Sequence, residues 1–310
     1  MIHHVFANRA NVGDWMSARA IQRLLGGDVV EHLCDEPFVA STLESLATLR
    51  DDDIVVIGGG GLLMDYFEPF WTGFAGIADR LRYCIWGVGL CDLKRENTRL
   101  DRELMQSMFA TSEVTVVRDQ LTARAFDGHL AIAPCPSVCI VDGRAPGFGV
   151  LHVDALDNVG DDVYHAMETV ARSFAVETSR PFNSINNMIP AGDARALSDT
   201  IAQYAAADLI VTGRLHGCII GLAMGRKVMA VSGDWKIESF MRAAGLREWV
   251  CDLADTDALS DMLHRLPGQQ SPDSFLQNAR SANQAIASHI QAIGGFERVA
   301  ASTLSGVDAR

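Results

Sequence analysis

Short apolar runs alternate with helical patterns along the first 140 residues, and the alternation restarts near residue 148. Apolar runs predict strands at residues 2–6, 29–33, 54–57, 82–87, 114–117 and 130–133, and apolar spacings of three and four predict helices at 15–25, 39–49, 73–81, 100–109 and 120–126. Strands that alternate with helices are typical of a parallel sheet covered on both faces. We therefore expect an α/β, doubly wound, Rossmann-like domain at residues 1–141.

The second cycle has predicted strands at 148–153, 209–212 and 228–231 and helices at 163–174 and 218–224. It indicates a second Rossmann-like domain at residues 147–273, joined to the first by the turn-forming residues 142–147. A helical pattern at 274–293 predicts a C-terminal helix, and we expect the segment 274–310 to brace the first domain, with its last ten residues frayed. Residues 177–195 follow neither period. Two such domains facing a cleft would bind a ligand between the carboxyl ends of their sheets.

Composition limits the partners of this chain. It has 310 residues, 48% of them hydrophobic, which is enough for two cores, and a formal net charge of −13 with a pI near 5.0. The negative electrostatic field of such a chain disfavours binding of nucleic acid. An acidic protein that binds an anion must concentrate its cations locally, so clusters of Arg and Lys are informative here.

The seven cysteines include no C-x-x-C pair, which predicts reduced, buried thiols. Cys135 and Cys139 leave a metal or redox site open as an alternative, although no second ligand pair accompanies them, and we expect neither metal nor cofactor. The chain begins without a leader pattern, and no apolar run approaches the roughly 18 residues that span a bilayer. These features predict an untethered cytoplasmic protein.

Four glycines, Gly58 to Gly61, follow the apolar run 54–57. If they form a loop, the backbone of Gly59 and Gly60 could approach a ligand closely; the alternative is a turn packed too tightly for side chains. Neither phosphate-loop pattern fits, since Leu63 stands where G-x-G-x-x-G needs its last glycine.

Polar residues also follow several predicted strands. Asn11, Gly13 and Asp14 lie between a strand and a helix, so Asp14 is either the helix N-cap or a base that faces the ligand, and Asn11 could reach substrate hydroxyls. Arg118 precedes Asp119, a predicted cap, and could either face the cleft or lie on the surface.

The segment from Thr212 to Gly217 ends a buried strand and opens a helix. Arg214 and His216 thereby lie beside a helix N-terminus, where backbone N–H groups already favour an anion, so two potentially cationic side chains there indicate a negative ligand. The alternative is a structural histidine beside a solvated arginine. Lys236 follows the strand 228–231 at the start of another helix, where it could be functional or solvated.

Taken together, these segments resemble the polysaccharide pyruvyl transferase family over residues 8 to about 240. The resemblance rests on Asn11-Val12-Gly13-Asp14, the glycines Gly58 to Gly61, Arg118-Asp119, the segment from Thr212 to Gly217, and Lys236, in matching order. It implies a fold similar to the glycosyltransferase-B arrangement, with the acceptor on the N-terminal side and the donor on the C-terminal side.

The resemblance further implies transfer of pyruvate from phosphoenolpyruvate to two hydroxyls of a sugar, forming a ketal in exopolysaccharide biosynthesis. His216 is then the acid, Arg214, Arg118 and Lys236 hold the anionic groups, and Asp14 orients or deprotonates the acceptor. Asn11, Gly13, Gly59, Gly60, Thr212 and Gly217 are the remaining substrate-binding residues.

The acceptor is expected to be a sugar, an oligosaccharide or a lipid-linked saccharide, and the last of these would bring the protein into peripheral contact with a membrane. Two other functions stay open: a glycosyltransferase of similar architecture that uses a nucleotide sugar, and a non-catalytic protein that binds a sugar or an anion. The sequence specifies neither the acceptor nor the oligomeric state.

Overall fold

The computed structural model describes residues 1–94, 100–126, 128–140, 146–154, 159–253, 255 and 257–295. Within these residues, the first part of the chain forms a six-stranded parallel sheet in the order β2-β1-β3-β4-β5-β6. Its strands are β1 (Ile2–Phe6), β2 (Val29–Leu33), β3 (Ile54–Leu63), β4 (Arg82–Leu90), β5 (Val114–Val117) and β6 (Ala131–Ile132). The helices that follow them are α1 (Val12–Leu25), α2 (Val39–Leu46), α3 (Glu68–Ala75), α4 (Arg102–Thr111) and α5 (Gln120–Ala125).

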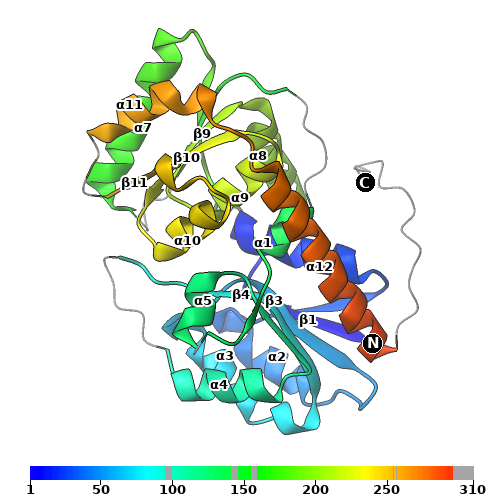
Figure 1. The fold of residues 1–310 in the computed structure, drawn as a ribbon. Coiled ribbons are helices and arrows are strands. Elements are labelled where there is room, and N and C mark those ends of the chain that lie inside the picture. The colour runs from blue at the N-terminus through cyan, green and yellow to red at the C-terminus, as the bar shows by residue number, and fades with distance from the viewer. Residues whose placement is uncertain are drawn as a thin grey trace.

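The second part forms a parallel sheet in the order β11-β10-β9-β7-β8. Its strands are β7 (Val150–Asp154), β8 (Phe182–Asn186), β9 (Leu209–Thr212), β10 (Lys227–Ser232) and β11 (Val250–Asp252). Its helices are α7 (Asp161–Glu177), α8 (Ala194–Ala206), α9 (Leu215–Ala223), α10 (Trp235–Ala243) and α11 (Ala258–Arg265). The predicted α/β class with two doubly wound sheets is confirmed (Figure 1).

Both sheets share one strand order. Counted from its own first strand, the second sheet runs 2-1-3-4-5 and the first runs 2-1-3-4-5-6. The order therefore reverses between β1 and β3 in the first sheet and between β7 and β9 in the second. Ligands of open parallel sheets bind at such reversals, outside the carboxyl ends of the strands. The loops after β1, β3 and β9 are therefore the places to look for a site.

The structure corrects several predictions. β3 does not end at residue 57 but continues through all four glycines to Leu63, so they are not a loop. The helix predicted at 73–81 lies at α3 instead, because Pro69 favours a helix start at Glu68 and the helix has ended by Gly76. Residues 177–195, for which no element was predicted, contain β8 and the start of α8, and β11 and α11 were also missed.

A long helix, α12 (Asp273–Gly294), crosses from one domain to the other. Its first turns, with Leu276, pack in the core of the second domain, and its later turns, with Ile290, pack in a core of the first (Figure 1). Asn283 accepts a 3.0 Å hydrogen bond from the buried Trp86 indole. The domain limits themselves stay predictions, because residues 141–145 of the linker and 296–310 of the tail lie outside the described residues.

Two short backbone pairings join the domains on either side of the space between the sheets. Asn11 forms an antiparallel bridge with Met188, and Leu93 forms another with Asp234. Hydrogen bonds of 2.8 Å from Val12 N to the Asn187 carbonyl and of 3.0 Å from Lys94 N to the Gly233 carbonyl extend these pairings. The loops at the carboxyl ends of both sheets are thus fixed against one another.

Within the described residues, every helix is too short or too polar to span a bilayer.

Candidate active site

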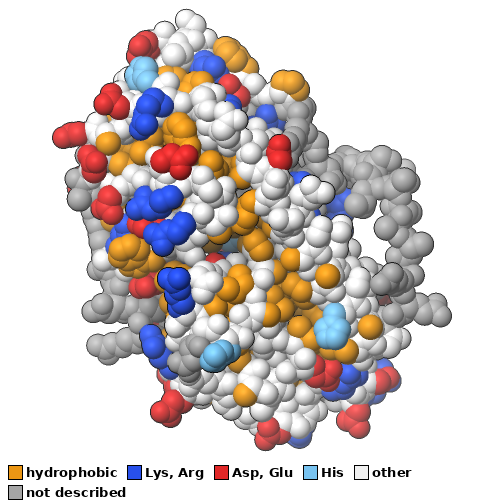
Figure 2. All heavy atoms as spheres, in the orientation of Figure 1, with side chains coloured by type: hydrophobic (Ala, Val, Ile, Leu, Met, Phe, Trp, Pro, Cys, Tyr) orange, Lys and Arg blue, Asp and Glu red, His pale blue; other side chains and the backbone are white. Residues whose placement is uncertain are grey.

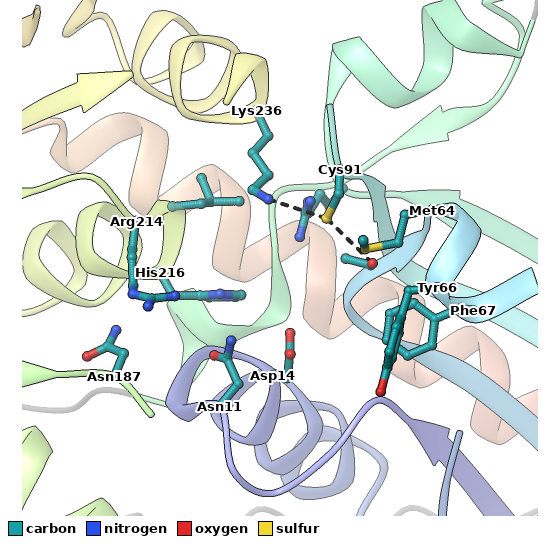
Figure 3. A pocket seen from close by; sticks show the side chains of 13 residues that line it. Asn11, Asp14, Met64, Tyr66, Phe67, Cys91, Asn187, Arg214, His216 and Lys236 are labelled. Atoms are coloured by element: carbon teal, nitrogen blue, oxygen red, sulfur yellow. Dashed lines mark hydrogen bonds between the residues drawn. The ribbon is translucent and has the colours of Figure 1, made fainter. Parts of the chain in front are cut away.

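A pocket of about 240 Å³ lies between the carboxyl ends of the two sheets (Figure 3). This volume is below the range of about 300 to 1,000 Å³ of pockets for drug-sized ligands, so the pocket suits a small ligand or one end of a larger one. The residues that line it come from both domains: Asn11, Asp14, Gly61, Met64, Tyr66, Phe67, Cys91, Arg118, Asn187, Arg214, Leu215, His216 and Lys236.

The turn from β9 into α9 presents a helix N-terminus to this pocket. Thr212 Oγ1 accepts a 3.0 Å hydrogen bond from Arg214 N, and a side chain at Gly217 would collide with the Thr212 hydroxyl, so both residues hold the turn. Arg214 occupies the N-cap position and, as far as the described residues go, no side chain caps this helix. The first N–H groups of α9 can therefore interact with an anion.

His216 is packed between the two domains. A Cβ at Gly13 would overlap the imidazole ring, so glycine is required where α1 meets α9. His216 Nε2 lies 3.1 Å from Ser17 Oγ and 3.6 Å from Cys135 Sγ. The first domain thus fixes the orientation of a ring that the second domain supplies.

The charge of His216 is strongly disfavoured in the protein alone. Burial, followed by the positive charges of Arg118, Lys236 and Arg214, lowers the pKa of His216 to about 3. Arg214, which the sequence places two residues before His216, acts in this direction. Burial and two further cations add to it.

Asp14 lies in the first turn of α1, but it is not the N-cap. Asn11 takes that place and accepts a 2.9 Å hydrogen bond from Gly13 N, so the carboxylate of Asp14 is available to line the pocket. A Cβ at Gly60 would meet that carboxylate. Burial raises the pKa of Asp14 to about 6, although Arg118 acts in the opposite direction.

Arg118 is buried, with 4% of its surface exposed, which excludes the alternative of a surface arginine. Its Nε lies 3.3 Å from Asp119, which caps α5 as predicted, and its guanidinium occupies space that a side chain at Gly89 would fill. Burial opposes the charge of Arg118, but Asp119, with smaller contributions from Cys91, Cys135 and Asp234, offsets burial, so the pKa of Arg118 is raised.

Lys236 lies in the first turn of α10, as predicted, and is half-buried. Its Nζ is 2.5 Å from Asp234 Oδ2 and 3.3 Å from Cys91 Sγ (Figure 3). Burial opposes the charge, yet Cys91 and Asp234 raise the pKa of Lys236. Both Arg118 and Lys236 therefore remain charged near neutral pH.

Glycines Gly59 and Gly60 serve packing at this site rather than lining the pocket. Both have positive φ, 80° and 107°, and side chains there would collide with Ser17 and Asp14 of α1. Among the residues that line the pocket, Gly61 comes from this run. The glycines let α1 lie against β3, which positions Asp14.

The pocket therefore unites Asn11, Asp14, Arg118, Arg214, His216 and Lys236, all selected from the sequence, whereas Gly13, Thr212 and Gly217 lie behind it and shape its walls. Sequence reasoning missed Met64, Tyr66, Phe67, Cys91 and Asn187. Met64, Cys91 and Asn187 come directly after β3, β4 and β8. The rule that ligands bind at strand ends would have found them had the ends of these three strands been known.

The described residues contain no group of three or more His, Cys, Asp or Glu side chains placed to hold a metal ion. The seven cysteines, all of them described, form no disulfide.

The pocket gathers cations in a protein that is acidic overall, with a net charge of −13. On the face shown in Figure 2, Asp and Glu side chains are interspersed among the Lys and Arg side chains.

A family model described as polysaccharide pyruvyl transferase matches residues 11–234 of the chain. The match begins at the α1 cap and ends at the α10 cap. It therefore includes every residue that lines the pocket except Lys236, which lies just beyond it. A search of curated proteins found no match.

Solved structures share the fold at low sequence identity. A UDP-GlcNAc 2-epimerase from Methanocaldococcus jannaschii, in complex with UDP-GlcNAc and UDP, has a TM-score of 0.59 at 9% identity, covering 94% of this chain and 99% of that chain. The S. aureus MnaA–UDP structure has 0.58 at 9%, covering 96% and 97%. An uncharacterised Klebsiella pneumoniae protein, KP1_0663, has 0.50 at 14%, covering 81% and 91%. The fold is thus of the glycosyltransferase-B type, with two Rossmann-like domains.

Proposed function

From the premise that this chain belongs to the polysaccharide pyruvyl transferase family and is a transferase, we propose that it moves pyruvate from phosphoenolpyruvate to two hydroxyls of a saccharide, forming a ketal. The observation that carries the proposal is the set of three cations, Arg118, Arg214 and Lys236, around His216 in a protein of net charge −13. Phosphoenolpyruvate is a small trianion with the charge that such a pocket needs.

The cations suit the two anionic groups of this donor. A guanidinium can hold a carboxylate or phosphate through two parallel hydrogen bonds, and Lys236 adds a point charge. The uncapped N-terminus of α9 adds backbone donors. The site thus holds phosphoenolpyruvate by charge and by directed hydrogen bonds.

The reaction needs one proton donor and two hydroxyl nucleophiles. A proton added to the methylene carbon makes the central carbon electrophilic; one hydroxyl attacks it, the bond to the phosphate oxygen breaks, and the second hydroxyl closes the ketal. One of the two hydroxyl protons replaces the proton given to the methylene carbon, and the other leaves on the phosphate. We assign the first proton to His216.

Binding of phosphoenolpyruvate raises the proton affinity of His216, which is low in the protein alone. Burial and three cations lower its pKa to about 3 in the protein alone. A bound trianion pairs with Arg118, Arg214 and Lys236 and attracts the imidazolium, so the pKa of His216 rises when the donor is present. Protonation of the acid is thereby coupled to donor binding.

The acceptor lies on the opposite side of the pocket in this proposal. Asn11 and Asp14 supply polar groups for hydroxyls, and Met64, Tyr66 and Phe67 supply an apolar wall (Figure 3). Asp14 accepts a hydroxyl proton, and its pKa of about 6 places it near neutral pH, where a general base works well. A saccharide that presents two hydroxyls to Asp14 would meet the donor beside His216.

The direct test is to mix the protein with phosphoenolpyruvate and candidate saccharides and to measure phosphate release together with the ketal product by NMR. Phosphate released in proportion to ketal supports the proposal. Turnover of a nucleotide sugar without release of phosphate from phosphoenolpyruvate contradicts it and favours a glycosyltransferase, whose fold this chain shares with enzymes solved with UDP. Binding of both compounds without turnover favours a non-catalytic protein.

A further inference from the structure

Asn187 is a buried amide at the pocket, and its nitrogen has no hydrogen-bond partner among the described residues. The residue is 1% exposed and lines the pocket just after β8. Its Oδ1 accepts a 3.0 Å hydrogen bond from the Tyr204 hydroxyl, but its Nδ2 makes no hydrogen bond to any of the described residues. Leaving a buried donor unsatisfied costs about 1–3 kcal/mol, so a partner from outside the chain is expected.

The backbone of Asn187 is held in place by the other domain. Its carbonyl accepts a 2.8 Å hydrogen bond from Val12 N, and the next residue, Met188, pairs with Asn11. With Tyr204 fixing the amide oxygen from behind, the side chain is anchored at both ends. The unpaired nitrogen is therefore a preorganised donor.

The groups around this nitrogen are hydrogen-bond donors as well. Arg214 lines the same side of the pocket, and the uncapped N–H groups of α9 follow it. Figure 3 shows Asn187 and Arg214 across the pocket from Tyr66 and Phe67. Amide, guanidinium and backbone N–H groups have only protons to offer there, so the group that satisfies all of them must carry several acceptor oxygens.

We propose that Asn187 binds the donor substrate. Its Nδ2 donates a hydrogen bond to the phosphate group of that substrate, which is held beside Arg214 at the N-terminus of α9. Phosphate is the donor group with the most acceptor oxygens and the one that helix N-termini favour. The assignment rests on the proposed function for the identity of the donor, phosphoenolpyruvate. It extends the anion site into a segment that no sequence pattern singled out.

The test distinguishes a role of the amide nitrogen in binding from a role in the stability of the fold. Asn187→Leu combined with Tyr204→Phe replaces both buried partners with apolar groups of similar shape, which leaves no unpaired polar atom behind. Tyr204→Phe alone is the matched control, since it removes the same buried hydrogen bond and keeps Nδ2. Asn187→Asp is a second variant, which keeps the acceptor for Tyr204 and replaces the donating nitrogen. Thermal melts verify that each variant is folded.

Affinities for phosphoenolpyruvate and for inorganic phosphate are then measured by calorimetry. We expect both to fall at least about 10-fold in the double variant and in Asn187→Asp, as for a lost hydrogen bond to a charged group, and less than about threefold in Tyr204→Phe. Unchanged affinity in folded variants would overturn the assignment, as would a loss for phosphoenolpyruvate without a loss for phosphate. If the wild-type protein binds phosphate but not phosphoenolpyruvate, the proposed function fails while the role of Asn187 toward phosphate is still tested.

Discussion

The two sides of the pocket are built from sheets of the same strand order but carry different chemistry. The C-terminal domain contributes Arg214, His216 and Lys236 from the first turns of α9 and α10. The N-terminal domain contributes Asp14 from α1 and an apolar wall that includes Tyr66, and its one cation among the described lining residues is the buried Arg118. Equivalent frameworks therefore acquire different roles through the residues at their strand ends.

Replacing His216 should give the largest effect, because it removes the proposed proton donor. We expect His216→Ala to lower kcat by at least about 100-fold while binding of phosphoenolpyruvate stays measurable. Rapid-quench phosphate release and calorimetry measure the two quantities. His264→Ala is the control, since that histidine is exposed and pairs with Glu177 on the far helices. Loss of donor binding in a folded His216→Ala protein would make His216 a clamp instead.

Arg214→Ala should weaken the donor side selectively. Loss of hydrogen bonds to a charged group predicts a KM for phosphoenolpyruvate that is about 10- to 150-fold higher, with a smaller change for the acceptor. Steady-state kinetics with each substrate varied in turn measure this, and Arg195→Ala, on the exposed face of α8, is the control. A change confined to the acceptor KM would reverse the assignment of the two sides.

Asp14 should give the pH dependence of the acceptor side. Because its pKa is raised to about 6, the carboxylate is protonated below that pH, and kcat/KM should rise as pH increases through about 6. Asp14→Asn should lower kcat/KM by about 100-fold and abolish this rise. Full pH profiles of both proteins measure it. An identical acidic limb in Asp14→Asn would assign the titration to another group.

Tyr66→Ala should have the smallest effect, and it tests whether the acceptor side of the pocket can be changed without changing the donor side. An aromatic contact is worth about 0.5–1.5 kcal/mol, so the acceptor KM should rise about 2- to 12-fold while the KM for phosphoenolpyruvate stays unchanged. Tyr66→Phe should retain most of the affinity, and Phe38→Ala, exposed but outside the pocket lining, is the control. An altered donor KM would contradict the separation of the two sides.

Much of the framework was predictable because most of its strands are rich in apolar residues. The strands at Ile2–Phe6, Val29–Leu33 and Leu209–Thr212 were predicted with the bounds they have. β8 was missed because it is a polar edge strand, Phe-Asn-Ser-Ile-Asn, whose outer side needs no apolar partner. The fold class thus follows from periodicity, whereas polar edge elements depend on tertiary contacts.

The site was predictable where residues follow strands whose ends are evident in the sequence. Arg118, Arg214 and Lys236 were selected in this way and all line the pocket. Met64 and Asn187 were not, because the ends of β3 and β8 could not be located: glycines in β3 read as a loop, and β8 carried no signal. For Asp14 the sequence left two roles open, helix cap or site residue, and the structure decides between them because Asn11 caps α1 and Asp14 lines the pocket.

Titration of the His216 imidazole by NMR, with and without saturating phosphoenolpyruvate, tests most directly whether the donor activates the acid. His216→Ala identifies the resonance. In the protein alone, with a pKa of about 3, the ring should stay neutral throughout the pH range of a folded protein. With donor bound it should titrate near or above the ordinary histidine pKa of about 6.5. A ring that remains neutral at pH 6 with the donor bound would contradict the account.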